Sequence, residues 1–199
     1  PEKWGSFSIG FVDSLSNLDP TLFGMNAKKD FVLSLLYRGL LQYNPETKTM
    51  EWDLATCDLW RNLKEIRCNL REGNIWSDGT KITIEDILAT YSLLAETEKN
   101  RRLQNWLAKF AITREWTSLV FRNSTANTEN IEFLTLPIIK KSVAEQMRVW
   151  EKTIEPIYSG EYIFDKKESN EAHENESFHL IKSPYTTRAI YDRLILRFY

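Results

Sequence analysis

The segment Leu70–Asp86, LREGNIWSDGTKITIED, carries two glycines, a tryptophan and four carboxylates. Glu72-Gly73 and Ser77-Asp78-Gly79 are turn signals, because glycine and aspartate favour the backbone angles of tight turns. Thr83 is a candidate helix N-cap, and two carboxylates follow it in the first turn, where the positive end of a helix dipole favours them. The segment is therefore predicted to be a structural joint, in which a strand passes through glycine turns into a capped helix.

Glu72 and Asp78 are the two carboxylates of this segment that the start of the helix does not explain. Asp78-Gly79-Thr80 resembles part of a calcium loop, but the alternate oxygen ligands and the closing glutamate of such loops are missing. An Asx turn, in which Asp78 bonds its own turn backbone, is the structural alternative to catalysis. The common nucleophile, phosphate-loop, dinucleotide and zinc motifs are absent from the sequence. We therefore predict no enzyme activity, no metal site and no cofactor.

The segment 57–70 alternates inward and outward side chains and is predicted to form a β-hairpin. A fold centred at Asn62-Leu63 makes three facing pairs agree on one register: Leu59 with Ile66, Asp58 with Arg67, and Cys57 with Cys68. With a two-residue turn the cysteines would be a hydrogen-bonded pair, the geometry less suited to a bridge. In an oxidising compartment Cys57 and Cys68 could form a disulfide, and in a reducing one they are two small buried side chains.

The remaining chain mixes helical and extended patterns. Apolar residues at helical spacing predict helices at 26–41, 84–94, 100–110 and 141–150, and short or alternating apolar runs predict strands at 7–12, 117–122, 131–136, 160–164, 178–182 and 192–199. The last pattern runs to the final residue, so we expect a fragment of a longer protein. The 26 basic residues nearly balance the 28 acidic ones, which argues against a nucleic-acid partner.

Several short motifs stand in one order along the chain. They are NLDP at 17–20, YRGLLQY at 37–43, LAT at 54–56, the segment 70–86, LPII at 136–139, SGEYIF at 159–164, SPY at 183–185 and YDRLILRF at 191–198. In this order they resemble the motifs of extracellular solute-binding proteins of family 5, which deliver oligopeptides, dipeptides or nickel complexes to ABC importers. The chain departs from the family pattern at Cys57, Lys81 and Glu161.

The resemblance implies an α/β fold, a periplasmic-binding-protein-like lobe of class II and the peptide-binding type. Such a lobe has a mixed sheet flanked by helices and an inserted α+β subdomain. Residues 1–42 and 133–199 would form the first, ligand-proximal lobe, and residues 43–132 the inserted subdomain. Because proteins of the family are much longer, the second lobe is expected to be absent from this chain.

The resemblance also implies a substrate-binding component that captures an oligopeptide or a similar small solute between two lobes and delivers it to a membrane permease. The expected ligand-binding residues of this lobe are Tyr162, the turn at Ser159-Gly160 and the loop after the first strand, Ser14, Leu15, Ser16 and Asn17. A core position is the alternative for Tyr162. We expect an extracytoplasmic monomer, and the alternative is a cytoplasmic solute-sensing domain of a transcription regulator.

Overall fold

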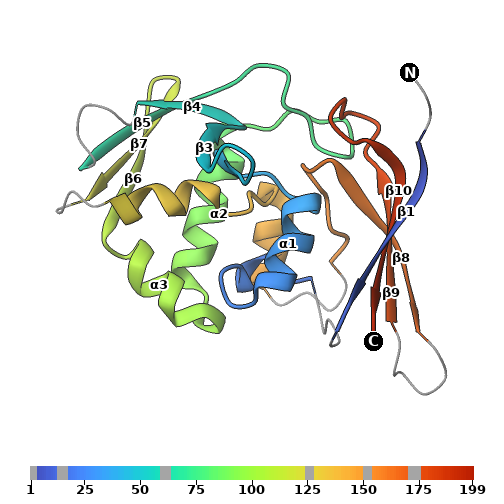
Figure 1. Ribbon diagram of the computed structural model, residues 1–199. Coiled ribbons are helices and arrows are strands. Elements are labelled where there is room, and N and C mark those ends of the chain that lie inside the picture. The colour runs from blue at the N-terminus through green and yellow to red at the C-terminus, as the bar shows by residue number, and fades with distance from the viewer. Residues whose placement is uncertain (1–3, 13–17, 59–63, 124–127, 150–153, 170–175) are drawn as a thin grey trace.

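The computed structural model describes residues 4–12, 18–58, 64–123, 128–149, 154–169 and 176–199. Two sheets lie at opposite ends of the molecule, and helices lie between them (Figure 1). Within these residues no helix is long and apolar enough to cross a membrane. The predicted α/β class is confirmed.

The first sheet contains strands from both ends of the chain, in the order β1-β10-β9-β8. β1 runs parallel to β10, and the other neighbours are antiparallel, so the sheet is mixed, as predicted. Leu194, Leu196 and Phe198 alternate along β10 and are buried in one cluster with helix α1. The strands are β1 (Trp4–Phe11), β8 (Tyr162–Ser169), β9 (Glu176–Lys182) and β10 (Tyr191–Phe198).

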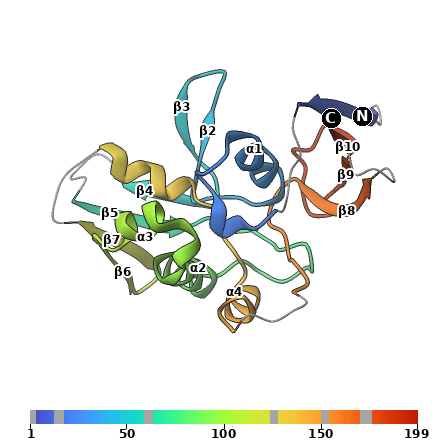
Figure 2. The ribbon, with the colours of Figure 1, turned by 90° about the horizontal axis from the view of Figure 1, so that it is seen from below.

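Helix α1 (Ala27–Leu36) packs on this sheet. It begins after Asn26, whose side-chain oxygen accepts hydrogen bonds from two backbone N–H groups of the first turn. It ends at Leu36 rather than at the predicted residue 41, because Tyr37 is extended and the chain continues into strand β2 (Leu41–Asn44). Strand β3 (Thr49–Trp52) pairs with β2 in a hairpin that projects beside α1 (Figure 2).

The second sheet is antiparallel and has the order β4-β5-β7-β6. Helices α2 and α3 share its apolar core, and α4 packs on α2. The strands are β4 (Ala55–Asp58), β5 (Glu65–Leu70), β6 (Phe110–Glu115) and β7 (Ser118–Asn123); the helices are α2 (Ile84–Glu96), α3 (Arg101–Leu107) and α4 (Lys141–Arg148), with short 3-10 helices η1 (Pro20–Leu22), η2 (Glu98–Asn100) and η3 (Thr128–Thr135).

Some predicted elements were wrong in type or length. Most of the predicted strand 131–136 lies in η3, because a short apolar run does not distinguish a buried strand from a buried helix. The predicted helix 100–110 ends at Leu107, and Phe110 already belongs to β6. Strand β6 and the β2–β3 hairpin were not predicted.

The predicted hairpin register is confirmed for the two pairs that the structure describes. Cys57 faces Cys68, and Asp58 faces Arg67, whereas the pair that includes Leu59 lies outside the described residues. A disulfide joins the two cysteines, whose Cα atoms are 4.1 Å apart. This spacing is typical of a non-hydrogen-bonded pair, so the expectation of a hydrogen-bonded pair was wrong.

The segment 70–86 is a joint that leads from β5 to α2. The Asp86 carboxylate is buried and accepts four hydrogen bonds. The donors are Nε1 of Trp76 at 3.3 Å, the backbone N–H of Thr83 at 2.8 Å, the Thr83 hydroxyl at 3.0 Å and the backbone N–H of Lys141 at 2.8 Å. These bonds fix the start of α2 against the start of α4.

Asp78, in the turn of this joint, forms the predicted Asx turn. Its Oδ1 atom accepts hydrogen bonds from the backbone N–H of Thr80 at 3.1 Å and from the Thr80 hydroxyl at 2.7 Å. Its other oxygen accepts from Lys140. The contacts therefore account for Asp78 as a turn residue.

Two apolar clusters divide the larger part of the core. One lies between the first sheet and α1, and the other lies between the second sheet, α2 and α3. Phe133, Leu134 and Ile138 belong to the second cluster, although the predicted boundary assigns residues from 133 onward to the first lobe. The division at 42/43 and 132/133 stays a prediction.

Candidate ligand-binding site

The structure describes only some of the predicted ligand-binding residues. Ser14, Leu15, Ser16 and Asn17 lie outside the described residues. Tyr162 is buried in the cluster with α1, and its hydroxyl oxygen accepts a hydrogen bond from the backbone of Tyr191 at 3.4 Å. In this lobe Tyr162 is therefore a core residue.

Strand register separates Tyr162 from the end of β1. Phe11, the last residue of β1, pairs with Phe198 on β10. Phe198 pairs with Glu176 on β9, and Glu176 pairs with Ser169 at the far end of β8. Tyr162 is the first residue of β8. Tyr162 pairs with Lys182, six residues along β9 from Glu176, so at about 3.3 Å per residue roughly 20 Å separate the two levels.

Ser159 and Gly160 lie at the C-terminal end of α1. Their backbone N–H groups donate to the Leu36 carbonyl oxygen at 3.2 and 2.8 Å. They therefore provide hydrogen bonds to a carbonyl group of the last turn that has no partner within the helix. A Cβ atom on Gly160 would lie 2.3 Å from the Leu35 carbonyl oxygen, so only glycine allows this approach. The predicted turn is thus engaged in holding α1.

Two cavities in the described part of the chain meet at Arg38, Glu161 and Arg188, which line both. The larger, which we call the α1 cavity, has a volume of about 430 Å³ and lies between α1, the β2–β3 hairpin and residues 135–137. The smaller, the loop cavity, has a volume of about 180 Å³ and lies between residues 71–75, 159–161 and 183–188. These three side chains, which we call the wall, therefore separate the α1 cavity from the loop cavity.

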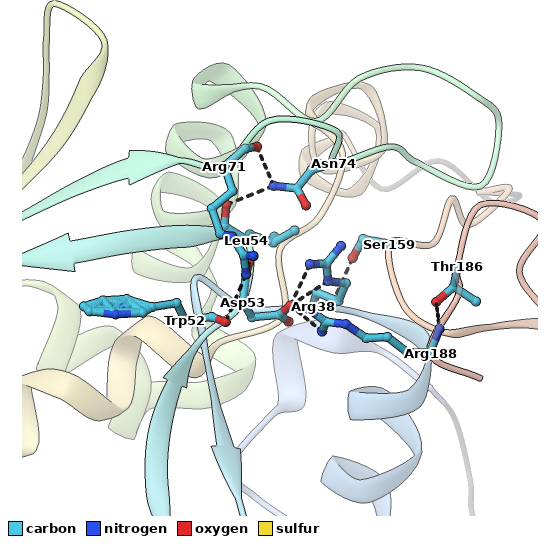
Figure 3. Close-up of polar contacts among 9 residues, drawn as sticks. All are labelled: Arg38, Trp52, Asp53, Leu54, Arg71, Asn74, Ser159, Thr186 and Arg188. Atoms are coloured by element: carbon cyan, nitrogen blue, oxygen red, sulfur yellow. Dashed lines mark hydrogen bonds and ion pairs between the residues drawn. The ribbon is translucent and has the colours of Figure 1, made fainter. Parts of the chain in front are cut away.

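Asp53 is the buried centre of this wall (Figure 3). Its Oδ1 atom accepts from Nε and Nη2 of Arg38 at 2.9 and 2.6 Å, and from Nη1 of Arg188 at 2.9 Å. Asp53 lies between β3 and β4, Arg38 follows α1, and Arg188 precedes β10. One carboxylate thus ties together three segments that are far apart in sequence.

Backbone contacts hold the residues of the wall in place. The Arg38 N–H donates to the Ser159 hydroxyl at 2.9 Å, and the Asp53 N–H donates to the Leu40 carbonyl at 3.1 Å. Nη1 of Arg71 donates to the carbonyl oxygen of Asp53 at 3.2 Å and to that of the preceding residue at 3.3 Å (Figure 3). The start of the joint therefore also supports the backbone under Asp53.

Glu161 adds a second carboxylate to the wall. Burial raises the pKa of Glu161 above its ordinary value, and the charge of Asp53 adds to this increase, whereas Arg188 and Arg38 oppose it. The uncharged form of Glu161 is therefore favoured over a wider pH range than in water. Asp53 is buried, and the two partly exposed guanidinium groups of the wall can bind anions.

Sequence reasoning missed Arg38, Asp53 and Arg188 as a group. No local motif joins them, because 135 positions separate Asp53 from Arg188. The spacing of these residues along the sequence contains no signal that marks them as a group.

Comparisons with known proteins support the fold. The murein tripeptide binding protein MppA of Escherichia coli has 15% identity and a TM-score of 0.81, with 98% of this chain and 42% of that chain covered. AppA of Bacillus subtilis, in complex with a nonapeptide, has 15% identity, a TM-score of 0.79, and coverage of 100% and 41%. NikZ of Campylobacter jejuni, in complex with Ni(L-His), has 17% identity, a TM-score of 0.78, and coverage of 98% and 39%.

The chain therefore spans about two fifths of the length of these solved structures. At such identities the likeness shows the fold. No curated protein matches the sequence. The family model described as bacterial extracellular solute-binding proteins, family 5 Middle, matches residues 50–199. This match covers more than half of the chain, and the chain therefore belongs to the bacterial extracellular solute-binding proteins of family 5.

Proposed function

We propose that this chain is the first lobe of the substrate-binding component of an ABC importer. The component captures an oligopeptide or a similar small solute between two lobes and delivers it to a membrane permease. The observation that carries this proposal is the shared fold, over nearly the whole chain, with solute-binding proteins that hold a nonapeptide or Ni(L-His). Coverage of two fifths of those proteins fits one lobe of two, and a solute-binding family favours binding over catalysis.

Closure on a ligand requires that the ligand contact both lobes, because only then does the closed state gain contacts that the open state lacks. We propose that Ser14, Leu15, Ser16 and Asn17, which follow β1, form the part of the cleft wall that this lobe contributes. β1 pairs with β10 at the end of the sheet where the described chain finishes.

The disulfide supports an extracytoplasmic location. Cys57 and Cys68 are bonded to each other, and structural disulfides persist in oxidising compartments but are rare in the cytoplasm. This favours an extracytoplasmic importer component over a cytoplasmic sensor of a transcription regulator, and we propose that the component is a monomer. No nucleic-acid contact is proposed for this lobe, because its formal net charge is −2.

A thermal-shift screen of the full-length protein tests the proposal. The panel contains di- to pentapeptides, nickel–histidine chelates and short sugars. A ligand at 100 times its dissociation constant should stabilise the protein by about 2.7 kcal/mol. A shift with peptides is expected. A shift with sugars alone, or with no member of the panel, would overturn the assignment to peptide import.

A further inference from the structure

We propose that the α1 cavity binds a molecule that joins a carboxylate to an apolar body, with the carboxylate on Arg188 and Arg38. This site is additional to the proposed cleft contact of residues 14–17, and its binding test does not depend on that contact. The proposal rests on the accessible charge, on the hydrogen-bond donors that remain at the wall, and on the apolar lining of the cavity.

The α1 cavity is lined by two guanidinium groups, those of Arg38 and Arg188, and by three carboxyl groups, those of Asp30, Asp53 and Glu161. The side chains of Arg188 and Arg38 are 41% and 20% exposed, whereas the side chain of Asp53 is only 3% exposed. Glu161 lies beside both arginines, whose charges oppose the increase that burial causes in its pKa. At the opposite end of the cavity, Asp30 accepts a hydrogen bond from a backbone N–H at 2.9 Å. The arginine end is therefore the end that attracts an anion.

The two guanidinium groups keep hydrogen-bond donors for a ligand. A guanidinium carries five N–H bonds in a planar fork. Arg188 donates to Asp53 through Nη1, and Arg38 does so through Nε and Nη2. Among the described residues, Nε and Nη2 of Arg188 and Nη1 of Arg38 have no protein acceptor. A carboxylate matches the spacing of such a fork and can accept two parallel hydrogen bonds.

The rest of the α1 cavity suits an apolar body. Its apolar lining is contributed by α1, the hairpin and the segment after η3: Phe31, Leu33, Leu41, Tyr43, Met50 and Pro137. Tyr43 and Met50 face each other across the β2–β3 hairpin, and both are exposed. A mostly apolar cavity of about 430 Å³ with a few convergent polar groups has the size and composition of a small-molecule site.

Calorimetry on the full-length protein tests this site, with 3-phenylpropionate as the probe and 3-phenylpropionamide as its neutral match. Loss of charge-assisted hydrogen bonds should weaken binding at least about tenfold for the amide, and about tenfold for Arg188→Gln. Arg188→Gln should still fold, because Arg38 keeps its two bonds to Asp53. Arg193→Gln is the matched control on β10, since Arg193 lies outside both cavities and pairs with Asp165.

Two further measurements make the outcome decisive. Glu72→Gln changes only the loop cavity, where Glu72 is an exposed lining residue, and should leave the affinity unchanged, whereas Tyr43→Ser should weaken 3-phenylpropionate several-fold. Any one of three outcomes would overturn the proposal. They are equal binding of the acid and the amide, unchanged affinity in an Arg188→Gln variant that unfolds like wild type, and no binding of the probe. Gly-Gly-Phe and its C-terminal amide, measured in wild type and in Arg188→Gln, separate two sources of the same chemistry, because only binding that Arg188→Gln weakens belongs to the α1 cavity rather than to the cleft. If this arginine-dependent binding of the peptide acid is tighter than that of the probe, the ligand is a peptide C-terminus, and if it is weaker, the ligand is a free aromatic acid.

Discussion

Two buried aspartates, Asp86 and Asp53, organise two different regions of this lobe. The Asp86 carboxylate accepts from a tryptophan N–H, a hydroxyl and two backbone N–H groups, and all of these donors are neutral. The Asp53 carboxylate accepts from two arginine side chains that are partly exposed. Both carboxylates are buried, but only Asp53 lies beside a cavity.

The difference shows how the donors of a buried carboxylate separate a structural role from a binding role. Backbone and indole donors are fixed by the fold, and the bonds to Asp86 leave them no capacity for a ligand. Each arginine has more N–H groups than Asp53 can use, so the same arrangement that neutralises Asp53 leaves donors at a surface. The four predictions below test this contrast.

Removal of the Asp86 carboxylate should have the largest effect on stability. Asp86→Ala leaves the donors of Trp76, Thr83 and Lys141 without their acceptor. Since each unsatisfied buried group costs about 1–3 kcal/mol, we expect the free energy of unfolding to fall by about 3–4 kcal/mol. Urea denaturation measures the change. Glu85→Ala, at an exposed neighbouring position, is the control, and a loss of similar size there would remove the special role of Asp86.

Loss of the disulfide should have the next largest effect, and it should be confined to the scaffold. Replacement of Cys57 and Cys68 by alanine should lower the free energy of unfolding by about 2–3 kcal/mol, because the short closed loop no longer restricts the unfolded chain. The affinity for 3-phenylpropionate should not change in the folded variant. Denaturation and calorimetry on the same sample check both expectations, and a parallel loss of affinity would contradict the separation of the two regions.

Asp53→Asn should change stability and affinity in opposite directions. Removal of the charge leaves two arginines side by side, but both are partly hydrated, so the expected loss of unfolding free energy is only about 1–2 kcal/mol. The same change makes the wall more positive and should tighten binding of 3-phenylpropionate. Calorimetry beside denaturation tests the sign. Weaker binding in the folded variant would mean that Asp53 positions the arginines more than it screens them.

The contrast between the two aspartates also explains what the sequence could predict. The joint around Asp86 was predictable because its N-cap, its turn glycines and its first-turn carboxylates lie within one short segment and follow local rules. The facing cysteines followed from strict alternation along neighbouring strands. The buried roles of Trp76 and of the Lys141 backbone were not predicted, because the first depends on the core of the second sheet and the second on how α4 packs.

The arginines of the wall and Asp53 could not be predicted as a group because only the tertiary fold brings their segments together. Arg38, Asp53 and Arg188 belong to three segments without a shared local pattern. The predicted strand at 131–136 failed for a related reason. Its apolar side chains satisfy the core equally well from a 3-10 helix, so tertiary packing decided the element.

Glu161→Gln should produce the smallest effect, and it should depend on pH. Burial raises the pKa of Glu161 in the folded state, so the carboxyl contributes stability below its ordinary pKa, and this contribution is lost as the pH rises through the raised value. Glutamine stays neutral throughout. The free energy of unfolding of the variant, relative to wild type, should therefore increase between pH 4 and pH 7, by less than about 1 kcal/mol because the group is partly exposed. Urea denaturation at several pH values measures this difference. A decrease over the same range would show that the two arginines, rather than burial, govern the ionisation of Glu161.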